Sequence, residues 1–98
     1  MTWEELRKHE LVVYSTSWCP DCRRLKQQLD RQGVKYREID IDRDAAAADR
    51  LRQATGRTAI PFLEINGRHL VRGWHDEHPG RWNEALFLSE VGKALSTR

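Results

Sequence analysis

The chain has 98 residues, of which 39% are hydrophobic and 33% charged, and its formal net charge is +2. This length predicts one domain over residues 1–98, and a charge so close to neutral argues against strong electrostatic attraction to nucleic acid or anionic lipid. No apolar run approaches the roughly 18 residues of a membrane span, and the first residues lack the basic and apolar pattern of a signal peptide, so we expect a cytoplasmic protein that binds neither membrane nor nucleic acid.

The first half of the chain predicts a helix followed by a strand–helix–strand unit. A capping-box pattern at Thr2 starts a short helix that ends at about residue 9. The continuous apolar run 11–14 predicts a central strand, and the next helix begins at Pro20 and ends near Gly33. Alternating side chains over 34–41 predict a second strand, which a right-handed crossover places parallel to the first.

The second half predicts a helix, a hairpin and a last helix. Asp42 or Asp44 caps an alanine-rich helix, and Asn66-Gly67 suits the positive φ angles of a type I′ turn between two antiparallel strands. We expect a helix up to Thr55-Gly56, strands over 62–65 and 68–71, and a helix from Arg81 to about Ala94. The fold class is therefore α/β: a three-layer sandwich with a four-stranded mixed sheet, helices on both faces and a short extra N-terminal helix.

Two cysteines stand three residues apart, in Cys19-Pro20-Asp21-Cys22, between the first predicted strand and its helix. A disulfide that closes so short a loop stabilises little, so this spacing indicates redox or metal chemistry. At the helix N-cap, the Cys19 sulfur faces unpaired backbone N–H groups and the positive end of the helix dipole, which favour a nucleophilic thiolate. Cys22, one turn inside, is expected to be more buried and to remain a thiol until it closes a Cys19–Cys22 disulfide.

Asp21 works against this thiolate, because a carboxylate beside the first turn repels a second negative charge. Arg23 and Arg24 offset that repulsion only in part, since they lie further along the helix. We therefore expect Cys19 to be acidified moderately, as in a reductant that works near neutral pH, not in a disulfide donor.

The segment from Tyr14 to Lys26 resembles the active-site segment of the glutaredoxin family, most closely that of bacterial mycoredoxin-like dithiol members. The similarity lies in Thr16-Ser17-Trp18 before Cys19 and Arg24-Leu25-Lys26 after Cys22. The resemblance implies a thioredoxin-like fold and thiol–disulfide exchange through the first cysteine. It also implies a cis proline facing that cysteine, for which Pro61 is the match, so that the backbone of Ile60 can pair with an extended substrate.

The same resemblance implies a substrate groove. Its expected residues are Trp18, Pro20, Ile60, Pro61, Gly73, Trp74 and Asp76, with Arg72 as a further candidate. The chain departs from the family at Thr16, where many members have a lysine, and at Ala59-Ile60-Pro61, where they have Thr-Val-Pro. The groove is expected to bind no resident cofactor. Glutathione, mycothiol, bacillithiol or a flavoprotein reductase all stay open as the source of electrons, and disulfide-containing proteins are the expected targets of a monomeric protein.

Other interpretations of the cysteines compete with a dithiol oxidoreductase. Half of a zinc site would need two further ligands, and the sequence has no second Cys-x-x-Cys. An iron–sulfur carrier would share a [2Fe–2S] cluster between protomers, but Pro20 stiffens the position where such carriers have a small residue. A non-catalytic peptide-binding module on the same fold would not need both thiols. His75 and His78 are expected to belong to a solvated polar loop, not to a metal site.

Overall fold

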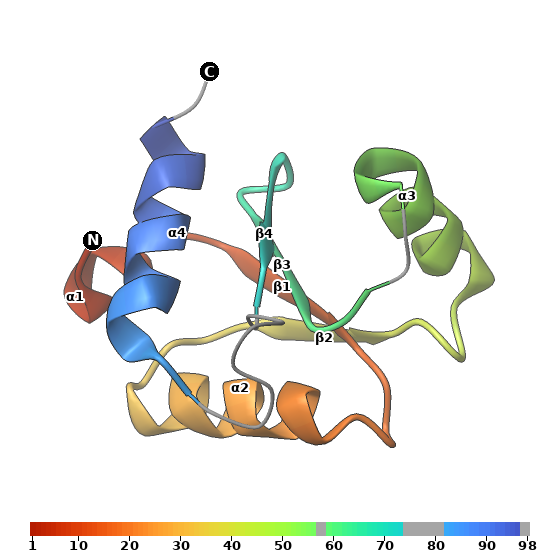
Figure 1. Ribbon diagram of the computed structural model, residues 1–98, viewed down its shortest axis with the longest axis horizontal. Coiled ribbons are helices and arrows are strands. Elements are labelled where there is room, and N and C mark those ends of the chain that lie inside the picture. Colours follow the sequence, from red (N-terminus) through yellow and green to blue (C-terminus); the bar gives the residue numbers. More distant parts are fainter. Residues whose placement is uncertain (57–58, 74–81, 97–98) are drawn as a thin grey trace.

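A four-stranded mixed sheet lies between two layers of helices in the computed structural model, which describes residues 1–56, 59–73 and 82–96 (Figure 1). The elements in chain order are α1 Trp3–Leu6, β1 Leu11–Ser15, α2 Pro20–Arg31, β2 Arg37–Asp40, α3 Ala45–Thr55, β3 Phe62–Ile65, β4 His69–Arg72 and α4 Glu84–Ser96. This order confirms the expected α/β sandwich with an extra N-terminal helix. The described helices are all too short or too polar to span a bilayer.

The strands follow the order β2-β1-β3-β4, which places β1 and β3 at the centre. β1 runs parallel to β2, with Val13 opposite Glu38, and antiparallel to β3, with Tyr14 opposite Phe62. The β3–β4 hairpin turns at Asn66 and Gly67, whose φ angles of 56° and 72° are those of the predicted turn. The carboxyl end of β1 is therefore flanked by the end of β2 and the beginning of β3.

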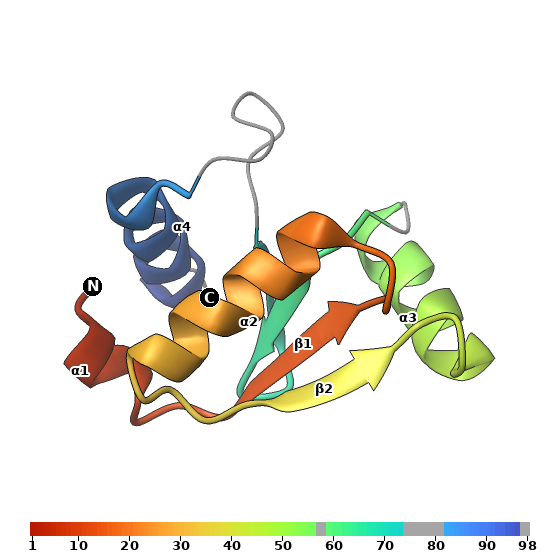
Figure 2. The ribbon, with the colours of Figure 1, turned by 90° about the horizontal axis from the view of Figure 1, so that it is seen from below.

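The helices cover the two faces of the sheet unequally (Figures 1 and 2). Helices α1, α2 and α4 pack on one face, where the apolar core includes Leu6, Val13, Leu25, Leu29, Leu63, Ile65, Phe87 and Val91. Among the described helices, α3 alone packs on the other face, over a smaller core of Tyr14, Ala47, Leu51 and Phe62. The inward face of α2 is formed by Cys22, Leu25 and Leu29, which are all fully buried.

The ends of α2 and α3 show why the chain turns where it does. Gly33, at φ 68°, follows α2, and the N–H of Val34 donates to the carbonyl of Leu29 at 2.9 Å, which completes a Schellman motif. Because this motif holds Val34, the second strand begins only at Arg37, and the expected start at residue 34 is wrong. Asp44, not Asp42, caps α3 by accepting the N–H of Ala47 at 3.0 Å.

Three other boundaries also differ from the prediction. Helix α1 ends at Leu6, short of residue 9, and the fourth strand covers 69–72, one residue later than expected. The last helix begins at Glu84, because the side chain of Asn83 caps it by accepting the N–H of Leu86 at 3.0 Å. The expected start at Arg81 lies outside the described residues.

Candidate active site

Cys19 caps α2 at the carboxyl end of β1. Its backbone is extended, at φ −87° and ψ 111°, and its Sγ accepts the N–H of Cys22 at 3.1 Å. Pro20 occupies the first helical position, where its missing N–H costs no helical hydrogen bond. The structure therefore confirms the predicted N-cap geometry, in which the first turn of α2 directs a backbone donor at the Cys19 sulfur.

The two thiols are both reduced, and they differ in burial. Cys19 is 7% exposed and Cys22 is 0% exposed, so the predicted order of burial is confirmed. The pKa of the Cys22 thiol is raised from 9.0 to about 12, first by burial and then by a hydrogen bond with the Cys19 side chain and by the charge on Cys19. A backbone hydrogen bond at Thr16 and the charge of Lys26 lower it, but they do not outweigh the raising effects. Cys22 is thus the inner thiol of the pair, and its burial keeps it protonated.

A polar network lies beside Cys22 that the sequence analysis did not predict. Lys26, one turn after Cys22, contacts Glu38 of β2 at 2.8 Å, and the same carboxylate oxygen accepts the hydroxyl of Ser15 at 3.0 Å. The hydrogen bond from Lys26 is the main reason that the pKa of Glu38 is lowered. Since residues four apart share one helix face, this network places a positive charge next to the buried thiol.

Trp18 is the one large hydrophobic side chain that is exposed in the described part of the chain, with 65% of its surface accessible. Its indole Nε1 donates to Oδ2 of Asp42 at 2.7 Å. From the sequence, Asp42 was predicted only as a candidate helix cap and not as a partner of Trp18; the nearest signal for this contact was a polar residue after a predicted strand. On the other side of Cys19, Asp21 pairs with Arg24 at 2.7 Å, which partly neutralises the carboxylate expected to oppose a thiolate.

The Ile60–Pro61 peptide bond is cis, as the resemblance implied. Pro61 immediately precedes Phe62, the partner of Tyr14, so it lies at the carboxyl end of β1, where the loop toward Cys19 starts. Gly73 donates its N–H to the carbonyl of Pro61 at 2.9 Å. The structure therefore brings two of the predicted groove residues together beside the cysteine loop, while Ile60 is half-buried against the α3 core.

Gly73 is packed so closely that a side chain would not fit without movement. An ideal Cβ there would lie 2.6 Å from Cδ2 of Leu25 and 3.2 Å from the carbonyl oxygen of Pro61. Leu25 stands one turn after Cys22, so the glycine lets the cis-proline segment approach α2 beneath the cysteine pair. Arg72, the other candidate beside it, holds its guanidinium 5.9 Å from the ring centre of Phe62.

Two predicted groove residues, Trp74 and Asp76, lie outside the described residues, as do His75 and His78. Within the described ranges, no three side chains of His, Cys, Asp or Glu are grouped as metal ligands would be.

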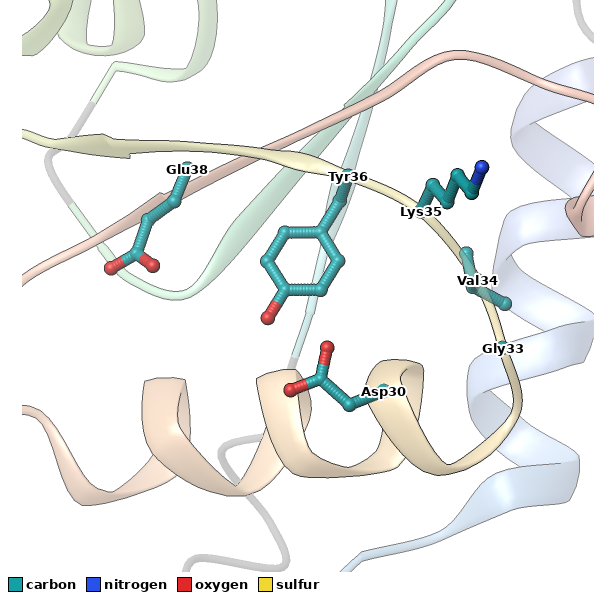
Figure 3. Close-up of a pocket in the computed structure, with 6 residues that line it drawn as sticks. All are labelled: Asp30, Gly33, Val34, Lys35, Tyr36 and Glu38. Carbon is teal, nitrogen blue, oxygen red and sulfur yellow. The ribbon is translucent and has the colours of Figure 1, made fainter.

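A hollow of about 710 Å³ lies at the opposite end of α2, between that helix and β2 (Figure 3). Tyr36 points across it toward Asp30, and burial together with a hydrogen bond to that carboxylate raises the pKa of Tyr36 to about 12. Lys35 points away from α2. Both cysteines stand at the start of α2, away from this hollow, and Glu38 is the one lining residue that also belongs to the polar network beside Cys22.

Comparison with known proteins agrees with the resemblance. Residues 11–70 match the glutaredoxin family. A glutaredoxin from Pseudomonas aeruginosa is 40% identical over 68 residues, which cover 69% of this chain and 80% of the relative. Among solved structures, the holo form of glutaredoxin C1 from Populus tremula x tremuloides is 29% identical with a TM-score of 0.56, covering 72% of this chain and 73% of its own. The glutaredoxin-like NrdH-redoxin from Escherichia coli, described as having a thioredoxin-like activity profile, is 25% identical with a TM-score of 0.60, covering 74% and 99%.

Proposed function

This chain belongs to the glutaredoxin family, whose members generally are thiol–disulfide oxidoreductases, and we propose that it reduces disulfides with Cys19 as nucleophile and Cys22 as resolving thiol. The observation that carries the proposal is the contrast between the two sulfurs. The Cys19 sulfur caps α2 and accepts a backbone N–H at 3.1 Å, whereas the Cys22 thiol is fully buried with a pKa of about 12.

The exchange follows from that contrast. The Cys19 thiolate attacks a target disulfide, forms a mixed disulfide with one target sulfur and releases the other as a thiolate, which takes up a proton. Cys22 then gives up its proton and attacks the Cys19 sulfur, which releases the second target thiolate. Two electrons have passed to the target, and the protein holds a Cys19–Cys22 disulfide.

The residues placed around these sulfurs support an extended substrate. The Ile60–Pro61 segment lies at the strand end beside the cysteine loop, and the family resemblance assigns the backbone of Ile60 to pairing with a peptide substrate. Pro20 and Trp18 flank Cys19, and Gly73 holds Pro61. We also assign Trp74 and Asp76 to this groove, on the resemblance alone.

The electron source belongs to the same proposal. Glutaredoxins use glutathione-type thiols as co-substrates, so glutathione, mycothiol and bacillithiol are all candidates. A flavoprotein reductase stays a candidate as well, in keeping with the thioredoxin-like activity profile described for the similar NrdH-redoxin. Thr16 occupies the position where many family members have a lysine. It is buried and has no positive charge that could bind the carboxylate of a thiol such as glutathione. Incubating the oxidised protein with each reductant in turn, and counting free thiols, identifies the source.

A single-turnover experiment tests the proposal without knowledge of the recycling system. The reduced protein is mixed with a mixed disulfide between a cysteine peptide and glutathione, and the products are identified by mass spectrometry. The wild type should release the peptide and end with a Cys19–Cys22 disulfide. Cys19→Ser should release none above the uncatalysed background, and Cys22→Ser should stop at a covalent adduct on Cys19.

Asp49→Asn, which changes one exposed carboxylate on α3, is the matched control and should behave as the wild type. Peptide release by Cys19→Ser at the wild-type rate would show that the roles of the cysteines are wrongly assigned. Release without formation of the internal disulfide would remove the resolving role from Cys22.

A further inference from the structure

The exposed ring of Trp18 is held in place by a carboxylate. Asp42 accepts the indole N–H at 2.7 Å, and the N–H of Asp42 in turn donates to Oδ1 of Asp40 at 2.9 Å. The ring is therefore anchored to the loop after β2 although 65% of its surface faces solvent. An exposed indole that is held at one edge keeps its faces accessible at low cost in side-chain entropy.

The hydrogen bond between Trp18 and Asp42 determines which part of the indole ring can bind a partner. Indole has a single donor, Nε1–H, and that donor is already used by Asp42. What remains is the π surface of the ring, whose negative quadrupole attracts an ammonium or guanidinium group.

The charges around Trp18 favour a cation as well. Asp21 is paired with Arg24, and Asp40 has Arg43 at 3.9 Å, whereas Asp42 has no basic partner within the described ranges. The negative charge of the Asp42 carboxylate, at the edge of the indole ring, can therefore pair with a cationic ligand. A cation on the ring would interact with the π face and with this carboxylate together.

We propose that Trp18 and Asp42 form a cation-binding subsite beside Cys19, which fits a Lys or Arg side chain next to the disulfide cysteine of a protein target. This inference rests on the proposed function, because it concerns what occupies the groove while Cys19 reacts. It assigns Asp42 as a specificity-determining residue and makes basic peptide disulfides, not acidic ones, the favoured substrate class.

The test compares peptides that differ at one position. Two mixed-disulfide peptides carry either Arg or Gln next to the reacting cysteine, and second-order reduction rates are measured in single turnover. An exposed cation–π contact and a surface ion pair together predict a preference for the Arg peptide of about three- to tenfold, which falls as the salt concentration rises.

Three variants separate the contributions. Asp42→Asn keeps an oxygen that accepts the indole N–H but removes the charge, so the ratio of Arg to Gln rates should fall toward one. Trp18→Leu removes the π face and should lower the same ratio. Asp49→Asn, an equal charge change on α3, should leave the ratio as in the wild type. If Asp42→Asn keeps the wild-type ratio, or if the wild type reduces both peptides equally, the subsite does not exist.

A second measurement makes the inference independent of turnover. With Ser in place of the peptide cysteine, the Arg peptide should shift the indole ¹H–¹⁵N signal of Trp18 in a saturable way, and the Gln peptide should shift it much less. If neither peptide disulfide is reduced yet the Arg peptide shifts the signal, the proposed function fails and the subsite stands. If both are reduced and neither shifts the signal, the subsite fails alone.

Discussion

The face of the sheet against α2 and α4 is packed with apolar side chains, whereas the face against α3 contains a buried carboxylate. That carboxylate, Glu64 of β3, is 6% exposed; it accepts the hydroxyl of Tyr14 at 3.1 Å and pairs with Arg50 of α3 at 2.7 Å. Burial and this carboxylate raise the pKa of Tyr14. The α2 side is thus held mainly by its apolar core, with one ion pair, Lys26–Glu38, whose carboxylate is 42% exposed, whereas the α3 side has a smaller core and an ion pair to a buried carboxylate.

The cysteine pair belongs to the first side. Its position depends on how closely Gly73, Pro61 and Leu25 approach one another, because these contacts join the cis-proline segment to α2. Adding atoms to a closely packed apolar contact lowers stability, and so does removing one charge of a buried ion pair. The two faces should therefore respond to opposite kinds of substitution.

Adding a methyl group on the apolar side should have the largest effect. In Gly73→Ala the new Cβ meets the fully buried Leu25 and the backbone of Pro61, so we expect the free energy of unfolding to fall by about 1–3 kcal/mol. The single-turnover rate with the peptide disulfide should fall as well, because the cis-proline segment must move. Urea unfolding and the rate measurement check both parts.

Gly92→Ala is the matched control. Gly92 lies inside α4, its added Cβ would be 3.4 Å from Cβ of Met1, and alanine favours the helix by up to about 1 kcal/mol. This variant should be as stable as the wild type or more so, with an unchanged rate. Equal stability of Gly73→Ala and the wild type would mean that the contact beneath the cysteines is not close.

Removing one charge on the α3 side should have a smaller effect. Arg50→Gln leaves the buried Glu64 with the Tyr14 hydroxyl alone, and we expect about 1–2 kcal/mol of destabilisation, since Arg50 itself is 58% exposed and solvent screens part of the pair. Urea unfolding at neutral pH measures it, and the single-turnover rate should not change.

Arg52→Gln provides a close comparison on the same helix. Its guanidinium is also 58% exposed, but its partner, Asp49, is 61% exposed, so the loss should stay below about 0.5 kcal/mol. Similar losses in Arg50→Gln and Arg52→Gln would show that the buried carboxylate does not distinguish this face.

Local signals in the sequence were sufficient for most of the fold. Caps and turns need only neighbouring residues, so Pro20, Gly33 and the Asn66-Gly67 turn predicted their elements correctly. The beginning of β2 was wrong because its alternating pattern extends into residues that the Schellman motif of α2 holds. An alternating pattern shows which residues suit a strand. It does not show that the backbone of some of these residues is hydrogen-bonded to the end of the preceding helix.

The candidate site divides in the same way. The cysteine pair and its N-cap were predictable, since both depend on residues 19–22 alone. The contact of Trp18 with Asp42 and the pairing of Glu64 with Arg50 were not, because each joins residues separated along the chain whose meeting depends on the register of the strands. A polar residue in an apolar strand, as Glu64 is, indicates only that some partner must exist.

Alkaline pH should reveal the smallest difference between the two faces, through the thiol buried on the apolar side. The pKa of Cys22 is about 12 in the folded protein against 9.0 ordinarily, so above pH 9 the unfolded chain releases a proton that the folded protein keeps. Stability should therefore fall as pH rises through this window, by about 1 kcal/mol between about pH 9 and pH 10 from this group.

Urea unfolding under reducing conditions should show a shallower fall in Cys22→Ala than in the wild type. The hydroxyl of Tyr36 adds to the pH dependence of stability only above its ordinary pKa of 10.0. Tyr36→Phe should therefore keep most of the wild-type slope up to pH 10.0. Parallel slopes for Cys22→Ala and the wild type would mean that Cys22 does not stay protonated in the folded protein through this pH window.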